Sequence, residues 1–158
     1  MTTGAESVKR DRVYCEQSQI EVYRDLAGTS EGGRKSARGA DLPPFKSLKD
    51  AFLMAMCLGV KTGRRTPLKQ RHELALLTYF NDHRDMAVLR AIAIAESGNV
   101  EILADQNQVL TIAEEYANAG FEELRRTAWG VALPLHRMVE LLLEDHEDYS
   151  AEASNVDE

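Results

Sequence analysis

The segment PFKSLKDAFLMAMCLGVKTGRRTPL, residues 44–68, joins a helix start, an apolar helix and a basic loop in one continuous stretch. Ser47 stands three residues before Asp50, which is the spacing of a capped helix N-terminus. Eight uncharged and mostly bulky residues follow at 51–58 and predict a buried helix. Gly59 is of the residue type that commonly terminates helices, so we expect this helix to end there.

The helix leads into a basic loop, which we define as residues 61–71. Gly63 and Pro67 predict a rigid, turn-rich course for it. It contains no acidic residue and five basic ones: Lys61, Arg64, Arg65, Lys69 and Arg71. Arginine forks suit phosphate or carboxylate oxygens, so these residues are our candidate surface for a partner protein or nucleic acid. The alternative left open is a solvated loop that pairs with the protein's own acids.

Composition favours one globular domain. The chain has 158 residues, of which 44% are apolar and 28% are charged, and this suffices for a continuous core. The longest apolar run is far shorter than the ~20 residues that a bilayer requires, and the polar start MTTGAESVKRDR lacks the apolar region of a secretory signal. The isolated Cys15 and Cys57 are expected to be reduced thiols. We therefore expect a cytoplasmic protein.

The net charge of −7 comes from the C-terminal end of the chain. Residues 141–158 contain seven acids and no Lys or Arg, so the remainder of the chain is formally neutral. We predict a mobile N-terminal segment at 1–11, a helical domain at 12–143 and an acidic disordered tail at 144–158. Within the domain, the glycine-rich stretch 28–43 is predicted to be a flexible loop.

Helical spacing of apolar residues recurs along the chain. It predicts helices at 17–27, at 73–80, between Asp82 and Ser97, at 107–119 and after Pro134. Residues 12–15 are predicted to form a brief extended piece, and 100–103 fits either a helical turn or a strand. The predicted fold is thus mainly α, a compact single-domain bundle of about six helices that could include one short β piece.

Two of these helices carry more specific expectations. The helix that follows Asp82, which Asn81 or Asp82 could cap, has apolar residues at most positions, so we expect it to be buried nearly all round. In 107–119, Glu114 and Glu115 are predicted to face solvent, and Gly120 is predicted to end the helix.

Catalytic motifs are missing from the sequence. The spacing of Gly59 and Gly63 is one residue short of a phosphate-binding loop, and no Lys-Ser/Thr pair follows it. His72, His83, His136 and His146 show no metal-ligand spacing. We therefore predict no cofactor and no metal site, and favour a protein that is not an enzyme. A metal-dependent nuclease built from residues distant in sequence is the alternative that such a motif search leaves open.

The 44–68 segment resembles the signature of the DNA phosphorothioation (Dnd) system-associated accessory proteins. Its landmarks here are Pro44-Phe45, Lys49-Asp50, Phe52, Gly59, Gly63-Arg64-Arg65 and Pro67-Leu68, followed by Ala91-Ile92-Ala93 with Glu96 and by residues 115–120. The similarity runs from about Arg12 to Leu142; the stretch 28–41 is longer than the pattern requires, and the tail is unmatched. The resemblance implies a setting in which a non-bridging oxygen of the DNA backbone is replaced by sulfur and companion proteins restrict unmarked DNA.

From the resemblance and the residues together we predict a non-enzymatic accessory or adaptor of a bacterial phosphorothioation-linked restriction system that acts in anti-phage defence. Its basic loop would dock onto a larger protein of the same system or onto the DNA backbone. Because the loop lacks aromatic residues for stacking on bases, direct DNA binding, which is the first alternative, would be independent of sequence. Self-assembly through an apolar helix face is a further alternative.

Overall fold

The computed structural model describes residues 8–29, 43–129 and 135–144. The first seven residues, most of the predicted flexible loop (30–42) and the predicted tail from 145 onward lie outside the described residues. The elements in chain order are β1 Arg12–Glu16, η1 Gln17–Gln19, α1 Ile20–Leu26, α2 Leu48–Thr62, β2 Arg71–Leu76, η4 Leu77–Tyr79, α3 Asp85–Ser97, η5 Val100–Ala104 and α4 Gln106–Ala128. Residues 135–144 are also helical. The fold is mainly α with one small sheet, as predicted.

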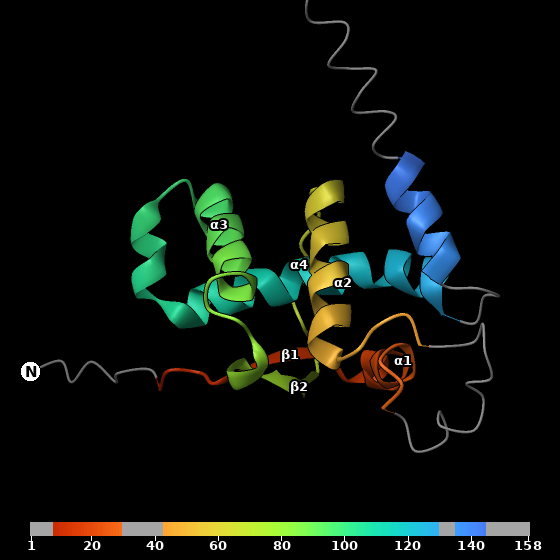
Figure 1. Ribbon diagram of the computed structural model, residues 1–158. Coiled ribbons are helices and arrows are strands. Elements are labelled where there is room, and N and C mark those ends of the chain that lie inside the picture. The colour runs from red at the N-terminus through yellow and green to blue at the C-terminus, as the bar shows by residue number, and fades with distance from the viewer. Residues whose placement is uncertain (1–7, 30–42, 130–134, 145–158) are drawn as a thin grey trace, which may run out of the picture.

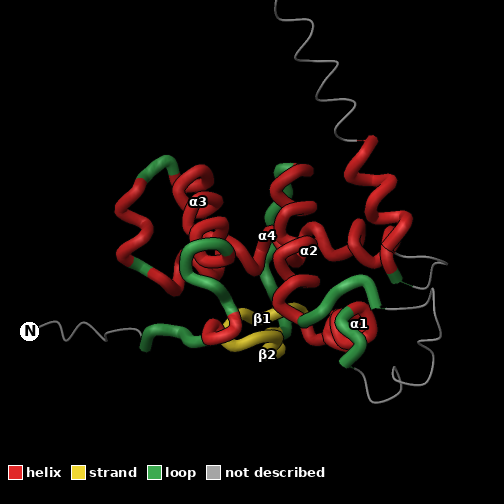
Figure 2. Tube along the Cα trace, viewed as in Figure 1, coloured by secondary structure: helices red, strands yellow, loops and turns green. Residues whose placement is uncertain are grey.

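The crossing of α2 and α4 is the centre of the molecule (Figures 1 and 2). A Cβ atom on Gly59 would lie 2.0 Å from the carbonyl oxygen of Tyr116, and one on Gly120 would lie 2.0 Å from that of Ala55. The two helix backbones therefore touch, and only glycine fits at the contact. The prediction that these glycines end their helices was wrong, because both lie inside helices that continue to Thr62 and Ala128.

The ends of α2 follow from its sequence. The Ser47 side chain accepts a hydrogen bond from the Asp50 backbone N–H at 3.2 Å, which confirms the predicted helix start. At the other end Gly63 adopts a left-handed φ of 64° and terminates the helix. Between these ends, α2 buries Phe52 and Met56 completely. Each such side chain stabilises the fold by roughly 1.5–3 kcal/mol relative to an exposed one.

The two strands pair antiparallel beneath the N-terminal end of α2 (Figure 1). The extended piece predicted at 12–15 is confirmed as β1, but the helix predicted at 73–80 was wrong, because β2 and the short η4 turn occupy that stretch. Val13 pairs with Ala75 and Tyr14 with Glu73, so Leu74 is an extra, bulged residue. The apolar residues of this stretch have helical spacing, but the backbone hydrogen bonds with β1, a strand about 60 residues earlier in the chain, hold it as a strand.

The helix α3 is less buried than predicted. It buries Met86, Leu89 and Ala93, whereas Val88 is 43% exposed and Ala91 is exposed. The prediction of burial all round was wrong because α3 packs against the rest of the molecule along one side only. Its start is supported by Asn81, whose side-chain oxygen accepts from two backbone N–H groups at 3.0 Å, and it ends at Gly98.

The remaining helices flank this centre. Ile20, Tyr23 and Ala27 are buried in and just after α1, on the face predicted for 17–27. The ambiguous stretch at 100–103 belongs to the η5 helix. No helix among residues 8–29, 43–129 and 135–144 is long and apolar enough to cross a membrane.

Candidate partner-binding loop

The basic loop leaves α2 at Gly63 and crosses α4 before it enters β2. The Thr66 backbone N–H donates to the carbonyl of Glu115 at 3.0 Å, and the Asn118 side-chain amide donates to the Thr66 carbonyl at 3.0 Å. Close to β2, the carboxylate of Glu16 accepts from the backbone N–H groups of Lys69 and Gln70 at 2.9 and 2.6 Å. These bonds satisfy backbone groups that a loop ordinarily leaves to water, so the path of the loop is fixed.

Arg65 ties the loop to two helices. Its guanidinium bonds the carboxylate of Glu115 on α4 at 2.6 Å and that of Glu96 on α3 at 2.7 Å. It also lies over the ring of Tyr116, 5.9 Å from the ring centre, and the Tyr116 hydroxyl donates to Glu96 at 2.5 Å. The hydroxyl first, and Arg65 second, lower the pKa of Glu96. The carboxylate is therefore held in its charged form, as the pairing with Arg65 requires.

Arg71 at the far end of the loop pairs with Glu114 of α4 at 3.0 Å. Glu114 is 2% exposed, so the prediction that it faces solvent was wrong. Its other partners come from the N-terminal part of the chain, namely the Arg10 guanidinium at 3.2 Å and the Tyr14 backbone N–H at 2.9 Å. Burial raises the pKa of Glu114 to about 7, even though the Tyr14 N–H and Arg71 act in the opposite direction.

The five basic residues predicted as one surface therefore occupy two kinds of place. Arg65 and Arg71 are ion-paired within the molecule, as the alternative of a self-paired loop expected for them. All five residues are exposed, so the difference between them lies in their pairing and not in their accessibility. Within the part of the chain that the structure describes, no ion pair involves the side chain of Arg64 or Lys69.

A family model described as DNA sulphur modification system-associated protein 4 matches residues 35–158. The chain belongs to this family. The family's description states an association with a DNA sulphur modification system, in agreement with the resemblance found in the sequence. The match includes the C-terminal segment that the resemblance had left unmatched, and it does not include β1 or α1. No curated protein and no solved structure matched the chain.

Several residues that carried the resemblance in the sequence lie next to the basic loop. Gly59 and Gly120 form the crossing beneath it, while Arg65, Glu96 and Tyr116 form the polar cluster beside it. Another landmark, Lys49, joins α2 to α3 through an ion pair with Asp85 at 2.8 Å. In this chain these residues thus position the loop and the helices that support it.

Sequence reasoning missed Glu16, Asn118 and Glu114 as supports of the loop. The first two act on backbone groups more than 50 residues away, which no local pattern can show. Glu114 did carry a signal, because it follows Leu110 by four residues and precedes Ala117 by three. That spacing places it on the inward stripe of the helix.

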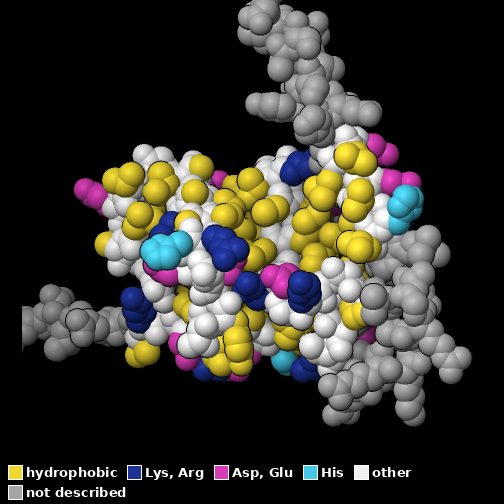
Figure 3. All heavy atoms as spheres, viewed as in Figure 1, with side chains coloured by type: hydrophobic (Ala, Val, Ile, Leu, Met, Phe, Trp, Pro, Cys, Tyr) yellow, Lys and Arg dark blue, Asp and Glu magenta, His cyan; other side chains and the backbone are white. Residues whose placement is uncertain are grey.

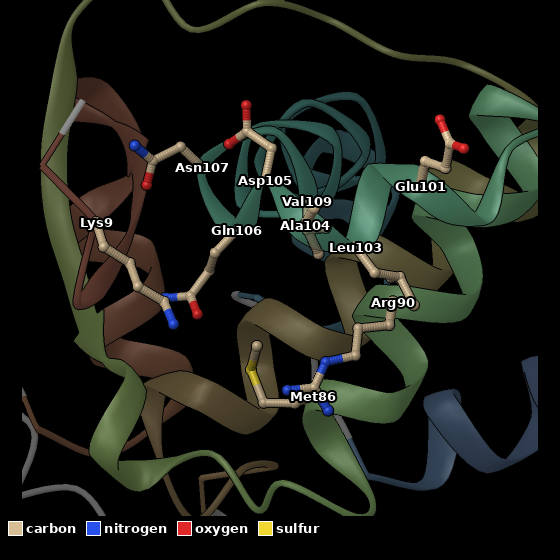
Figure 4. Close-up of a pocket in the computed structure, with 10 residues that line it drawn as sticks. All are labelled: Lys9, Met86, Arg90, Glu101, Leu103, Ala104, Asp105, Gln106, Asn107 and Val109. Atoms are coloured by element: carbon tan, nitrogen blue, oxygen red, sulfur yellow. The ribbon is translucent and has the colours of Figure 1, made fainter. Parts of the chain in front are cut away.

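A cavity of about 500 Å³ lies between α3, η5, the start of α4 and the segment that precedes β1 (Figure 4). Lys9 and Arg90 line it, but Arg90 is paired with Asp82 at 2.8 Å, and the carboxylates of Glu101 and Asp105 point away from its centre. No histidine, cysteine or serine is among its described lining residues. In the described part of the chain, no group of three His, Cys, Asp or Glu residues could hold a metal ion.

Proposed function

We propose that this family member is a non-enzymatic accessory of its DNA sulphur modification system and that it docks onto a larger protein of that system through the basic loop. The observation that supports the proposal is the fixed backbone of the loop. Glu16 and Asn118 bind its main chain, and Arg65 binds two helices. A loop held in this way presents Arg64 and Lys69 without the entropy cost of ordering a flexible segment on binding.

An acidic patch on a partner protein suits this surface better than duplex DNA does. Arg65 and Arg71 are already ion-paired with carboxylates of the molecule itself. The loop also has Glu16, Glu96 and Glu115 as close neighbours, so its cations do not form the continuous basic stripe that tracks a run of phosphates. Arginine and lysine at two or three positions are enough to fix the orientation of a protein–protein contact and to speed its formation.

The test is a charge reversal in the full chain. Arg64→Glu combined with Lys69→Glu should abolish co-purification with the tagged proteins of the DNA sulphur modification system expressed beside it. The control is Arg126→Glu with Arg125→Glu, an exposed and a half-buried cation in the last turn of α4, which should leave co-purification unchanged. Equal recovery of the partner with both double variants would remove the loop from the docking surface.

Contact with the DNA backbone is the second candidate, and the exposed Arg64 and Lys69 favour it. If these two residues neutralise phosphates, the logarithm of the affinity for a duplex should fall with the logarithm of salt concentration at a slope of about −2. Fluorescence anisotropy of labelled duplexes, with and without backbone sulfur, measures this slope. A complete lack of binding at low salt rules out the second candidate without affecting the first.

A further inference from the structure

The helix of residues 135–144 leaves most of its apolar side chains uncovered. Met138 is 7% exposed, and Leu141 packs against the core as a partly buried residue. Four other large apolar residues of the same ten-residue helix are exposed: Leu135 at 61%, Val139 at 45%, Leu142 at 54% and Leu143 at 60%. Their spacing of three, four and seven residues places them along one side of the helix. The helix therefore has a second apolar side besides the one that contacts the domain.

The uncovered side continues onto the neighbouring part of the domain. Figure 3 shows hydrophobic side chains gathered over this helix and across to α2. The four exposed side chains of the helix alone present on the order of 400 Å² of apolar surface, within the range for the largest patch on a monomer. A standard interface buries about 800 Å² per partner, so the patch is large enough to form the apolar centre of one.

The charges of the helix are divided between its halves. His136 and Arg137 lie in the first half, whereas Glu140 and Glu144 lie in the second. Within one copy, Arg137 and His136 both reach Glu140, at 3.0 and 3.2 Å. If two such helices pack antiparallel, the basic half of each lies beside the acidic half of the other. The helix is thus complementary in charge to a second copy of itself.

We propose that this protein forms a homodimer in which the 135–144 helices of two copies pack antiparallel about a two-fold axis near Val139. Leu135 then lies beside the partner's Leu143, and Val139 lies beside its own copy. The contact is isologous, so it closes at two subunits. The sequence that follows the helix, 145–158, has six acids and only Tyr149 and Val156 as large apolar residues. That composition offers little apolar surface for covering the patch from within the same chain.

The first test measures the mass of the full chain by sedimentation equilibrium over a range of concentrations. The wild-type protein should be a dimer, and Val139→Glu should raise the dissociation constant at least about 30-fold, because two buried charges would face each other at the axis. Val100→Glu is the matched control, since Val100 is 64% exposed on η5, and it should remain dimeric. Circular dichroism checks that both variants keep their helices. A wild-type protein that is monomeric at every concentration overturns the proposal.

The second test does not depend on a destabilising substitution. With the exposed Cys57 replaced by serine, Val139→Cys should form a disulfide-linked dimer on mild oxidation, because only a residue near a two-fold axis meets its own copy. Leu135→Cys alone should not, but an equal mixture of Leu135→Cys and Leu143→Cys should form the mixed dimer. Efficient self-linking of Leu135→Cys would indicate a parallel pair of helices and, like a lack of linking in Val139→Cys, contradicts the antiparallel homodimer.

Discussion

The basic loop and the helix of residues 135–144 use their side chains in opposite ways. In the loop, the charged residues Arg65 and Arg71 turn back onto the molecule and hold it together. In the helix, apolar residues such as Leu135 and Leu142 face outward and contribute little to the fold of a single copy. The comparison shows that residue type alone does not indicate whether a side chain stabilises the fold. The neighbours that the tertiary structure brings to each side chain determine this.

The largest effect is expected at the crossing that supports the loop. Gly120→Ala places a methyl group 2.0 Å from the Ala55 carbonyl oxygen, so α2 and α4 must separate, at a cost of at least about 3 kcal/mol in the free energy of unfolding. Urea denaturation measures this loss. The control is Gly98→Ala, where φ is +68° but no atom lies within 4 Å, and it should cost only about 1 kcal/mol. Equal losses would mean that the helices can move apart freely.

A pH-dependent effect of similar size is expected at Glu114, which anchors the end of the loop. Its pKa is raised from 4.5 to about 7 by burial. Between these values the folded state binds more protons than the unfolded state, so stability falls as pH rises. The stability difference between the wild type and Glu114→Gln should therefore decrease by on the order of 3 kcal/mol from pH 4.5 to pH 8. A difference that grows with pH would show that Arg10 and Arg71 outweigh the cost of burial.

A smaller effect is expected from loosening the loop itself. Arg65→Met keeps much of the side-chain length but removes the bonds to Glu96 and Glu115, and should cost about 1 kcal/mol because the pairs are partly exposed. Amide hydrogen exchange should accelerate at Thr66, whose N–H bonds the Glu115 carbonyl. The control is Arg125→Met, which removes an exposed pair within α4. Unchanged exchange at Thr66 would show that the backbone bonds hold the loop without Arg65.

The smallest effect is expected in the C-terminal helix. Leu142→Gln should change the unfolding free energy by less than about 0.5 kcal/mol at low protein concentration, because the side chain is 54% exposed. The same substitution should lower the apparent stability at high concentration, where association contributes. Thermal unfolding at several concentrations distinguishes the two contributions. A large loss at low concentration would mean that Leu142 belongs to the core of a single copy.

The sequence predicted the features that depend on near neighbours. The cap at Ser47, the end of α3 at Ser97 and the extended piece at 12–15 were all recognised from the local sequence. The missed features depend on contacts between distant segments. Gly59 and Gly120 are glycines, the residue type that is common at helix ends. Only the crossing of α2 and α4 shows that they are contact residues inside their helices. Burial of Glu114 requires Arg10 and Arg71, which approach it from positions 104 and 43 residues away.

The candidate site was predicted in part. The location of the basic loop next to α2 followed from Gly63 and the run of cations, but the division of those cations did not. Whether an arginine is exposed or paired depends on which acids the tertiary fold brings near it. Glu96 and Glu115 lie 31 and 50 residues beyond Arg65, so no sequence window could have indicated the pairing.

The segment that matches the family model is shorter than the part of the chain that packs together as one fold. The match begins at residue 35, yet β2 has its ladder partner at 12–16, and the buried Tyr23 packs its ring against Phe121, 5.1 Å away between ring centres. A fragment that begins at residue 35 would lack β1, so β2 would have no strand to pair with. It would also lack Tyr23, so Phe121 of α4 would lose its aromatic neighbour. The matched segment of this chain therefore depends on β1 and α1, which lie outside it, for part of its packing.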